Sequence, residues 1–362
     1  MVHDELAYWL GFARVSRIGS KRTEQLETHF GSLPAAWGAP LADLRAAGMD
    51  SATLRSLSQA WNNIDPSDEL RRLEHAGVQA ITWHDPAYPS RLKEIADPPP
   101  VLFVRGELVP ADEWSVAVVG TRRVSPYGRQ VTEELSRGLA QNGITVTSGL
   151  ARGVDGIAHT AALDGGGRSI AVLASGLDFI YPPEHKGLAR RVEAAGALVS
   201  EHPLGVQPRA DYFPRRNRIL SGLTLGALII EAGKGSGALH TANWANEQNR
   251  EVFAVPGRIT SPTSEATNAL IQQGMAKLVT QVSDILEELN LQMVEHQIEL
   301  SALIPEDPTQ ALILAKLSGD PMHVDEAMRA ANLPAATVSS TLAMLEMKGL
   351  VRQVGPMVYV RT

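Results

Sequence analysis

Short apolar runs recur through the middle of the chain and alternate with longer amphipathic stretches. The runs lie at residues 116–119, 145–147, 170–173, 197–199, 225–230 and 252–255. Runs of this length, separated by helix-length segments, are typical of buried parallel strands joined by crossover helices. Two further runs, at 79–83 and 101–105, are expected to add edge strands. We therefore predict an α/β fold, an extended Rossmann-like doubly wound sheet, over residues 66–285.

The N-terminal residues show a different pattern. Residues 1–65 carry apolar positions at helical spacing, which predicts an N-terminal helical domain similar to SAM and helix-hairpin-helix modules. The turn at 15–22 places Ile18 and Gly19 among basic residues. Such a turn either packs two helices together or holds a nucleic-acid phosphate on its amides. The sequence favours packing, and both interpretations stay open.

The C-terminal residues predict a third domain after a linker at 286–306. Residues 307–362 have the pattern of three short helices followed by a strand hairpin, which is similar to a winged helix. Its third helix, at 334–348, offers only Lys348 as a cation, and Glu346 offsets that charge. Because duplex binding depends on phosphate neutralisation, we favour a protein-interaction role or weak contact with duplex DNA.

Charge is unevenly distributed along the chain, whose net charge is −7. Residues 115–281 hold 17 Lys and Arg against 13 Asp and Glu, whereas the remainder holds 16 against 27. A local basic surface matters more to an anionic ligand than the total charge does. The absence of cysteine excludes disulfides, thiolate catalysis and cysteine-ligated zinc. Because we find neither a signal peptide nor a membrane-length apolar run, we expect a cytoplasmic protein without membrane contact.

Glycine-rich and basic sequences follow several predicted strands, whose carboxyl ends should meet at the ligand-binding edge of the sheet. Ser125 and Pro126 predict a helix start whose free N–H groups and dipole would attract an anion. The glycines there complete neither a dinucleotide fingerprint nor a P-loop. The residues that we expect to contact an anion are Gly120, Thr121, Arg122, Arg123, Ser148, Gly149, Arg152, Gly153, Arg216, Asn217, Arg218, Lys234, Ser236 and Gly237.

Simpler roles exist for several of these positions. Glycines at strand ends commonly form turns, Asp155 could cap a helix, and Glu231 could pair with an arginine. His159 and His240 lie in helical segments, where we expect packed and hydrogen-bonded side chains. Ser148 and Ser236 have no base that the sequence identifies, and no metal-ligand spacing is present. We therefore expect no enzyme activity, no metal and no cofactor.

Aromatic residues near the same loops indicate which anion is bound. Binding of single-stranded nucleic acid combines cations along the backbone with aromatic faces on which bases stack. Aromatic residues make up only 5% of the chain, and the five in or beside these loops are Tyr127, Phe179, Tyr181, Tyr212 and Phe213. Core packing is the simpler role for Phe179 and Phe213. The set as a whole favours a single-stranded nucleic acid.

A series of motifs in one order resembles the DNA-processing protein A family (DprA, also called Smf). The motifs lie at 116–122, 148–155, 175–182, 200–203, 213–219, 236–242 and 255–257. The resemblance covers roughly residues 80–280. It implies an extended Rossmann domain that binds single-stranded DNA without hydrolysing nucleotide. It also implies a homodimeric recombination mediator that protects incoming strands in natural transformation, or in DNA repair, and helps to load RecA.

Carried over by position, the resemblance implies DNA contacts for Gly120–Arg122, for Arg152 and for the Arg216-Asn217-Arg218 segment. Many relatives place a lysine directly after the Tyr-Pro pair, where this chain has Pro183 and then Lys186 three positions later. Lys186 is the candidate replacement. The helix that contains Asn268, Ile271 and Gly274 matches the part used for dimerisation and RecA contact.

A rival interpretation comes from the same kind of sheet. Phosphoribohydrolases of the lysine-decarboxylase-like group resemble this region and carry a Gly-Gly-x-Gly-Thr-x-x-Glu loop. Aligning Thr241 with the threonine of that loop puts Trp244 in the place of the catalytic glutamate. The phosphoribohydrolase interpretation therefore lacks its acid.

Overall fold

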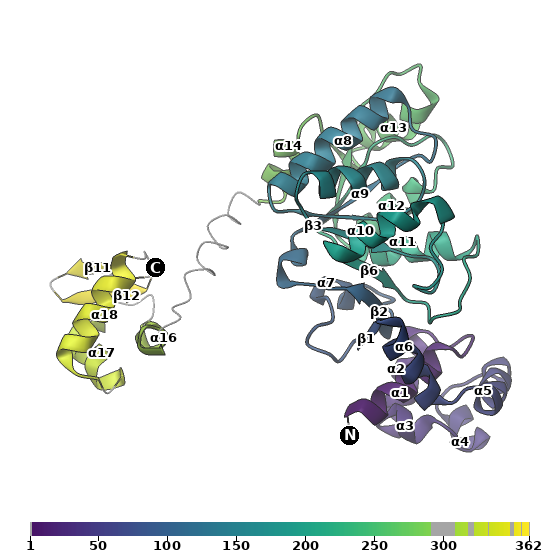
Figure 1. Ribbon diagram of the computed structural model, residues 1–362, viewed down its shortest axis with the longest axis horizontal. Helices are drawn as coiled ribbons and strands as arrows, with labels where there is room; N and C mark the ends of the chain where they lie inside the picture. The colour runs from purple at the N-terminus through teal and green to yellow at the C-terminus, as the bar shows by residue number, and fades with distance from the viewer. Residues whose placement is uncertain are drawn as a thin grey trace. The chain divides into compact units, whose positions relative to one another are not determined.

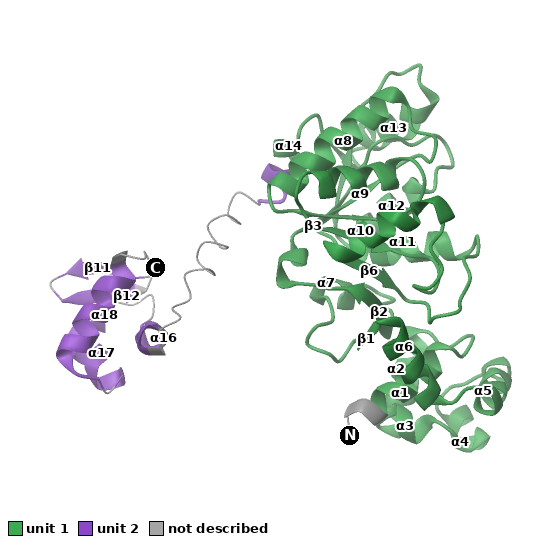
Figure 2. Cartoon of the chain, viewed as in Figure 1, with its two compact units in different colours: residues 1–285 green, residues 286–362 purple. Residues whose placement is uncertain are grey.

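The computed structural model divides into two compact units, residues 1–285 and 286–362 (Figure 2). It describes residues 2–290, 308–317, 322–331, 333–347, 351–355 and 357–361. Most of the predicted linker, from 291 to 306, lies outside these ranges. Its first residues belong to helix α14 (Val282–Glu288). None of the helices in the described ranges is long and apolar enough to cross a membrane.

A nine-stranded sheet forms the centre of the first unit, in the order β1-β2-β6-β5-β4-β3-β7-β8-β9. Figure 1 labels strands β1, β2, β3 and β6 of this sheet. The strands are β1 (Gln79–Thr82), β2 (Val101–Gly106), β3 (Ser115–Val119), β4 (Thr145–Ser148), β5 (Ser169–Val172), β6 (Gly196–Ser200), β7 (Gly226–Ile229), β8 (Glu251–Ala254) and β9 (Lys277–Leu278). The eight predicted strands are confirmed to within a few residues. The two-residue strand β9 was not predicted.

The direction of the strands confirms the predicted fold class. Strands β3 to β9 pair in parallel, whereas β1 and β2 join the β6 edge as antiparallel additions. Chain order reverses at β3, which pairs with β4 on one side and β7 on the other. In doubly wound sheets, this switch point opens a crevice beyond the carboxyl ends of the strands.

Helices cover both faces of this sheet. They are α7 (Ser90–Lys93), η1 (Pro110–Glu113), α8 (Pro126–Gln141), α9 (Val154–Asp164), η2 (Pro183–His185), α10 (Lys186–Ala194), α11 (Tyr212–Gly222), α12 (Ala238–Glu247), η3 (Pro262–Ser264) and α13 (Glu265–Gln272). Alternate residues of a strand face opposite sides. Ile170 and Val172 accordingly pack in one cluster with α11, α12 and α13, whereas Ala171 and Leu173 pack in another with α10.

The N-terminal helices share that second hydrophobic cluster. They are α1 (Val2–Ala13), α2 (Ser20–Phe30), α3 (Leu33–Ala36), α4 (Leu41–Ala46), α5 (Ser51–Asn63) and α6 (Pro66–Ala76). Phe12 and Leu26 lie in one continuous cluster with Phe103 of β2 and Leu198 of β6. This shared core groups the helical module and the sheet into one unit.

The second unit has the elements of a winged helix. It contains α16 (Pro308–Lys316), β10 (Met322–His323), α17 (Val324–Ala331), α18 (Ala335–Met347), β11 (Val351–Gly355) and β12 (Val358–Arg361). Its three strands pair in the order β10-β12-β11, and Ile313, Val338 and Leu342 are fully buried in its own core. The predicted helices and hairpin are confirmed. Lys348, on which the charge argument depended, lies outside the described residues.

Candidate nucleic-acid interface

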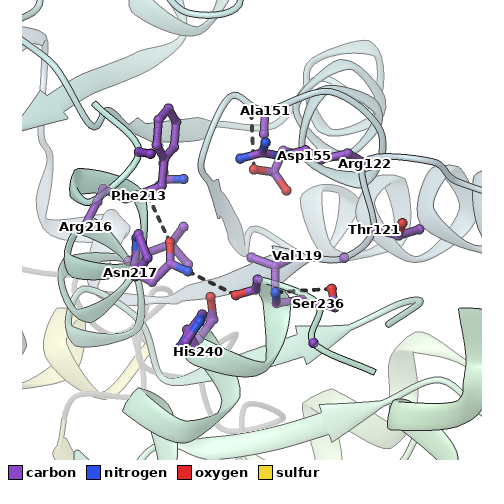
Figure 3. A pocket seen from close by; sticks show the side chains of 18 of the residues that line it. Val119, Thr121, Arg122, Ala151, Asp155, Phe213, Arg216, Asn217, Ser236 and His240 are labelled. Carbon is purple, nitrogen blue, oxygen red and sulfur yellow. Dashed lines mark hydrogen bonds between the residues drawn. The ribbon is translucent and has the colours of Figure 1, made fainter. Parts of the chain in front are cut away.

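A groove of about 820 Å³ lies at the switch point between β3 and β7, and we call it the first groove (Figure 3). Its walls come from the loops after β3, β4 and β7 and from the start of α11. The structure brings nine of the predicted residues together there: Gly120, Thr121, Arg122, Arg123, Arg216, Asn217, Lys234, Ser236 and Gly237. Asp155, Tyr181, Phe213, His240 and Thr241 also line it.

The loop after β3 presents two arginines to solvent. The Thr121 N–H donates to the Glu231 carbonyl at 2.8 Å, and the Arg123 N–H donates to the Thr121 hydroxyl at 3.1 Å. These bonds hold the loop against the end of β7. Arg122 and Arg123 are exposed and form no ion pair within the described ranges. Their charges are therefore available to an anion.

The N-terminus of α8, by contrast, is closed by the chain's own groups. Ser125 caps α8 as predicted, because its hydroxyl accepts the Gly128 N–H at 3.0 Å. The Ser125 N–H and hydroxyl donate to the two oxygens of the buried Glu231 carboxylate, at 2.9 and 2.6 Å. Pro126 has no N–H to offer. Our expectation that this helix end is open to an anionic ligand is wrong, because the Glu231 carboxylate of the same chain already occupies it.

We predicted that Glu231 pairs with an arginine, but its hydrogen-bond partners are instead Ser125 and Thr263. Its carboxylate accepts from the Thr263 hydroxyl at 2.9 Å, in addition to Ser125. A Cβ at Gly128 would lie 2.2 Å from a Glu231 oxygen, so a residue without a side chain is required there. The carboxylate therefore joins the start of α8, the end of β7 and η3.

Arg216 lies at the floor of the first groove and is 4% exposed. One of its terminal nitrogens donates to the Gly149 carbonyl at 2.8 Å and to the Val172 carbonyl. It forms no ion pair with the described part of the chain, although Asp155 is near enough to act on its charge. Burial lowers the pKa of Arg216 to about 10, so the guanidinium remains charged at neutral pH. A buried cation outside any ion pair favours an anionic ligand.

Asp155 is the buried carboxyl group beside this arginine. Burial raises its pKa, whereas the positive charge of Arg216 and the amides of Ala151 and Gly149 act in the opposite direction. The Ala151 N–H donates to its carboxylate at 3.2 Å. Asp155 thus holds the turn that leads into α9, which agrees with a structural role.

The glycine-rich loop after β7 forms the opposite wall. Asn217 donates to the Gly237 carbonyl at 3.3 Å, which connects α11 to the start of α12. The capping position of α12, Gly237, has no side chain, and Gly235 adopts a φ of +74°. Lys234 pairs with Glu265 at 2.5 Å, but its side chain is 84% exposed. This loop gives the groove an exposed cation, whereas the first N–H groups of α12 already donate to Ser236 and Gly237.

Aromatic rings stand beside these cations. The Phe213 ring lies 5.8 Å from the ring of Tyr181, edge to face, and the Arg122 guanidinium lies 5.5 Å above Phe213. Tyr181 is 43% exposed. The Tyr127 hydroxyl donates to the Pro256 carbonyl, and Tyr127 does not line the first groove. Tyr181 and Phe213 are therefore the two predicted aromatics that a ligand in this groove can reach.

Five predicted residues lie behind or beside the first groove. Ser148 is buried and donates to the Val118 carbonyl at 2.6 Å, whereas Gly149 lies against Arg216. Arg152 is exposed and pairs with Glu184 at 2.6 Å. Gly153 has a φ of +78°, and a Cβ there would meet the Thr121 carbonyl. Lys186 is exposed at the first position of α10.

Arg218 was expected to lie at the same edge, and that expectation is wrong. Residues two positions apart on a helix project about 200° apart, so Arg216 and Arg218 leave α11 on opposite sides. The Arg218 side chain is 9% exposed and pairs with Asp97 at 3.1 Å and Glu201 at 2.6 Å. Its charge is already balanced inside the protein.

The two histidines differ from each other. His159 is buried, and its Nδ1 lies 2.7 Å from the Ser169 hydroxyl, which confirms the packed role. His240 is instead exposed on the first groove, so the packed prediction was wrong for it. Sequence reasoning also missed that Glu231 organises the loops. The signal available was an acidic residue ending a buried strand, together with a glycine three positions after a serine cap.

Comparison with known proteins finds two matching family models. Residues 79–290 match DNA recombination-mediator protein A, and residues 299–355 match the DprA winged helix domain. The chain is 46% identical to Protein Smf of Escherichia coli, over 85% of this chain and 83% of that protein. The structure of DNA processing protein A from Streptococcus pneumoniae matches with a TM-score of 0.67 and 34% identity, over 78% of this chain and 96% of that one.

A second solved structure concerns single-stranded DNA. It describes the single-stranded DNA binding mode of DNA processing protein A from Helicobacter pylori. It matches with a TM-score of 0.53 and 31% identity, and covers 59% of this chain and 97% of that chain.

Proposed function

Because the chain belongs to the DNA recombination-mediator protein A family, we propose that it binds single-stranded DNA in the first groove and acts as a recombination mediator. The observation that carries this proposal is the set of cations without ion pairs at the switch point of the sheet. Arg122, Arg123 and the buried Arg216 all line one groove and form no ion pair in the described part of the chain, with Asp155 as the single carboxylate among the described residues that line it.

The proposed binding mode follows from the arrangement of these groups. Arg122 and Arg123 contact successive phosphates, and Arg216 attracts a phosphate towards the floor. Bases rest against Tyr181 and Phe213, which offer faces that every base can stack on. Such contacts read no base edges, so binding is independent of sequence. The relative from Helicobacter pylori, described as binding single-stranded DNA, supports this mode.

Single strands are preferred over duplex for a geometric reason. Bases in a duplex are stacked on each other and present only their edges, so Tyr181 and Phe213 gain no stacking partner. The test compares affinity for oligo-dT and for duplex of equal length across a salt series. We expect tighter binding of oligo-dT at every salt concentration. Equal affinities would contradict the proposed mode.

A phosphoribohydrolase activity is not favoured. Asp155 is the one carboxylate among the described residues that line the first groove, and the Ala151 N–H already bonds it. Trp244, at the aligned position of the missing glutamate, does not line this groove. Release of free base from nucleoside monophosphates by the wild-type protein, lost in Asp155→Asn, would instead support the enzyme.

Self-association is part of the proposal. Strand β9 is the last strand of the sheet among the described residues. Leu278 on it is 44% exposed, and Met275, just before it in the chain, is 41% exposed. A terminal strand with exposed apolar side chains fits a symmetric partner. Of the residues named from the sequence, Ile271 packs on the core, Asn268 bonds Gly257 in both directions, and Gly274 ends α13 in the open. We therefore propose β9 and Met275 as the surface of the dimer.

Delivery of the bound strand to RecA completes the proposed role and is supported by family membership. Natural transformation and DNA repair are the processes in which a mediator of this family would act. The direct test is RecA filament formation on strands covered by single-strand binding protein. We expect the wild-type protein to shorten the lag of that reaction and Arg122→Ala to lose the effect.

A further inference from the structure

A second groove, of about 730 Å³, lies between the N-terminal helices and the sheet. The turn between α1 and α2, at 16–20, forms one wall together with residues 99–101. Residues 201–203 and the first turn of α11 form the other. The residues that we propose to hold the strand in the first groove do not line this second groove. Helix α11, however, contributes side chains to both grooves.

The two grooves are separated by one short stretch of chain. Arg209 lines both of them. The first turn of α11 then divides its side chains: Phe213 and Arg216 face the first groove, whereas Tyr212 and Arg215 face the second. A polymer leaving the first groove across this turn therefore enters the second without a break.

The second groove has cations in excess once its ion pairs are counted. Its three acidic residues, Asp97, Glu201 and Asp211, are all paired with Arg218 or Arg209. Arg17 and Arg215 are exposed and form no ion pair within the described ranges. The groove thus has charge and donors for an anion.

The position of Arg17 is fixed by its surroundings. Arg17 has a φ of +75°, a conformation that residues other than glycine rarely adopt. Arg22 stabilises it by donating to the Arg17 carbonyl at 2.5 Å, and Arg22 is itself held by Asp50 at 2.8 Å. A strained turn that its neighbours hold in place is a common property of ligand-binding loops.

Aromatic faces accompany these cations, as they do in the first groove. The Tyr212 ring stacks on His202 at 4.4 Å, with the Arg209 guanidinium 5.1 Å from its centre. Trp244 of α12 and Trp9 of α1 also line the groove. Arginines outside ion pairs next to aromatic rings are the combination that single-stranded nucleic acid requires.

We propose that the second groove continues the path of the bound single strand. The strand crosses the first turn of α11, its next phosphates lie near Arg215 and Arg17, and its bases meet Tyr212 and Trp244. This inference rests on the proposed function, because it assumes a strand in the first groove. It assigns to the N-terminal turn a contact with the backbone of single-stranded DNA.

The test uses the double variant Arg17→Ala/Arg215→Ala in the full chain, with oligo-dT of about 6 and about 24 nucleotides. Each phosphate contact contributes about 0.7 to the slope of log K against log salt for a single strand. We expect the double variant to lower the slope for the long strand by about 1.4 and to leave the short strand unchanged. The matched control is Arg45→Ala/Arg190→Ala, which removes equal charge from exposed arginines that line neither groove.

The outcomes separate the two claims. A long-strand slope equal to that of the wild type would overturn the second groove as a DNA site, and would leave the first groove intact. Failure of the wild-type protein to bind even the short strand would refute the proposed function itself. Quenching of tryptophan fluorescence by the long strand but not the short one, lost in Trp244→Phe, is expected as an independent readout.

Discussion

The Arg216 guanidinium fills the space that a side chain at position 149 would need. A Cβ built on Gly149 would lie 2.2 Å from one of its terminal nitrogens. The glycine is buried and cannot contact a ligand, yet it determines where the charged floor of the first groove lies. Gly149 was predicted to contact DNA, and in the structure it affects the groove by leaving space for Arg216.

We expect Gly149→Ala to weaken single-stranded DNA binding about tenfold or more, because Arg216 must move and abandon its carbonyl acceptors at a cost of at least about 1–3 kcal/mol. Binding is measured by fluorescence anisotropy with labelled oligo-dT. The matched control is Gly187→Ala, since a Cβ there meets nothing within 4 Å. Unaltered binding by Gly149→Ala would show that Arg216 does not hold the strand.

His159 gives the stability of the fold a defined pH dependence. Burial lowers its pKa from 6.5 to about 3, because the charged imidazole is disfavoured in the core. Between these two pH values His159 binds a proton in the unfolded chain and not in the folded chain. The free energy of unfolding is therefore unaffected by protonation of His159 above pH 6.5 and falls as the pH drops below that value. The loss is about 1.4 kcal/mol per pH unit in that window.

We therefore expect the free energy of unfolding of His159→Gln to fall less steeply from pH 6.5 to pH 5 than that of the wild type. Urea denaturation at a series of pH values measures this difference, in which the other histidines cancel. Parallel curves for the two proteins would mean that His159 is protonated in the folded state.

Among the elements, helices α8 and α11 do most to determine which groups face the two grooves. Ser125 caps the N-terminus of helix α8, and the Glu231 carboxylate closes that end of the helix. The first groove therefore depends on side-chain cations rather than on this helix end. Helix α11 has two functional faces, one towards each groove. The Arg-Arg-Asn-Arg sequence of α11 alone does not tell that Arg218 is the arginine that forms internal ion pairs.

Ser125→Ala is expected to lower the free energy of unfolding by about 1–2 kcal/mol, the usual contribution of a helix cap. It removes the acceptor of the Gly128 N–H and one donor to the buried Glu231 carboxylate. Urea denaturation is the measurement. Ser67→Ala, at an exposed position in α6, is the control and should change stability by less than about 0.5 kcal/mol.

The strands could be predicted from the sequence because each is a continuous apolar run, buried on both faces of a parallel sheet. Strand β9 could not, because two residues that are both exposed leave no such pattern. The cations after the strands were also foreseeable. The pairing of Arg218 with Asp97 and the closure of α8 by Glu231 were not, because each joins residues more than 100 positions apart.

For the whole molecule, one unit contains both grooves and the β9 edge, and the other has its own core. The proposed dimer repeats both grooves on a second copy and doubles the length of strand that one assembly can hold. The N-terminal helices share a hydrophobic cluster with the sheet, which makes the second groove a fixed feature of this unit.

Leu278→Lys is expected to convert the dimer to a monomer of 38.9 kDa, because it replaces an exposed apolar side chain of the proposed contact with a charge that resists burial against a second copy. Light scattering coupled to size-exclusion chromatography measures the mass. The matched control is Leu41→Lys, which puts the same charge on a leucine of α4 that is 46% exposed, and it should remain dimeric. A monomeric wild-type protein would refute the dimer, and a dimeric Leu278→Lys variant would move the contact away from β9.

The salt dependence of oligo-dT binding by wild type, Arg122→Ala and Arg190→Ala tests the central claim most directly. Arg122 lines the first groove, stacks over Phe213 and has no ion pair within the described ranges, whereas Arg190 is an exposed arginine of α10 outside both grooves. We expect Arg122→Ala to bind more weakly, with a slope of log K against log salt smaller by about 0.7, and Arg190→Ala to match the wild type. Identical slopes for wild type and Arg122→Ala would contradict the account.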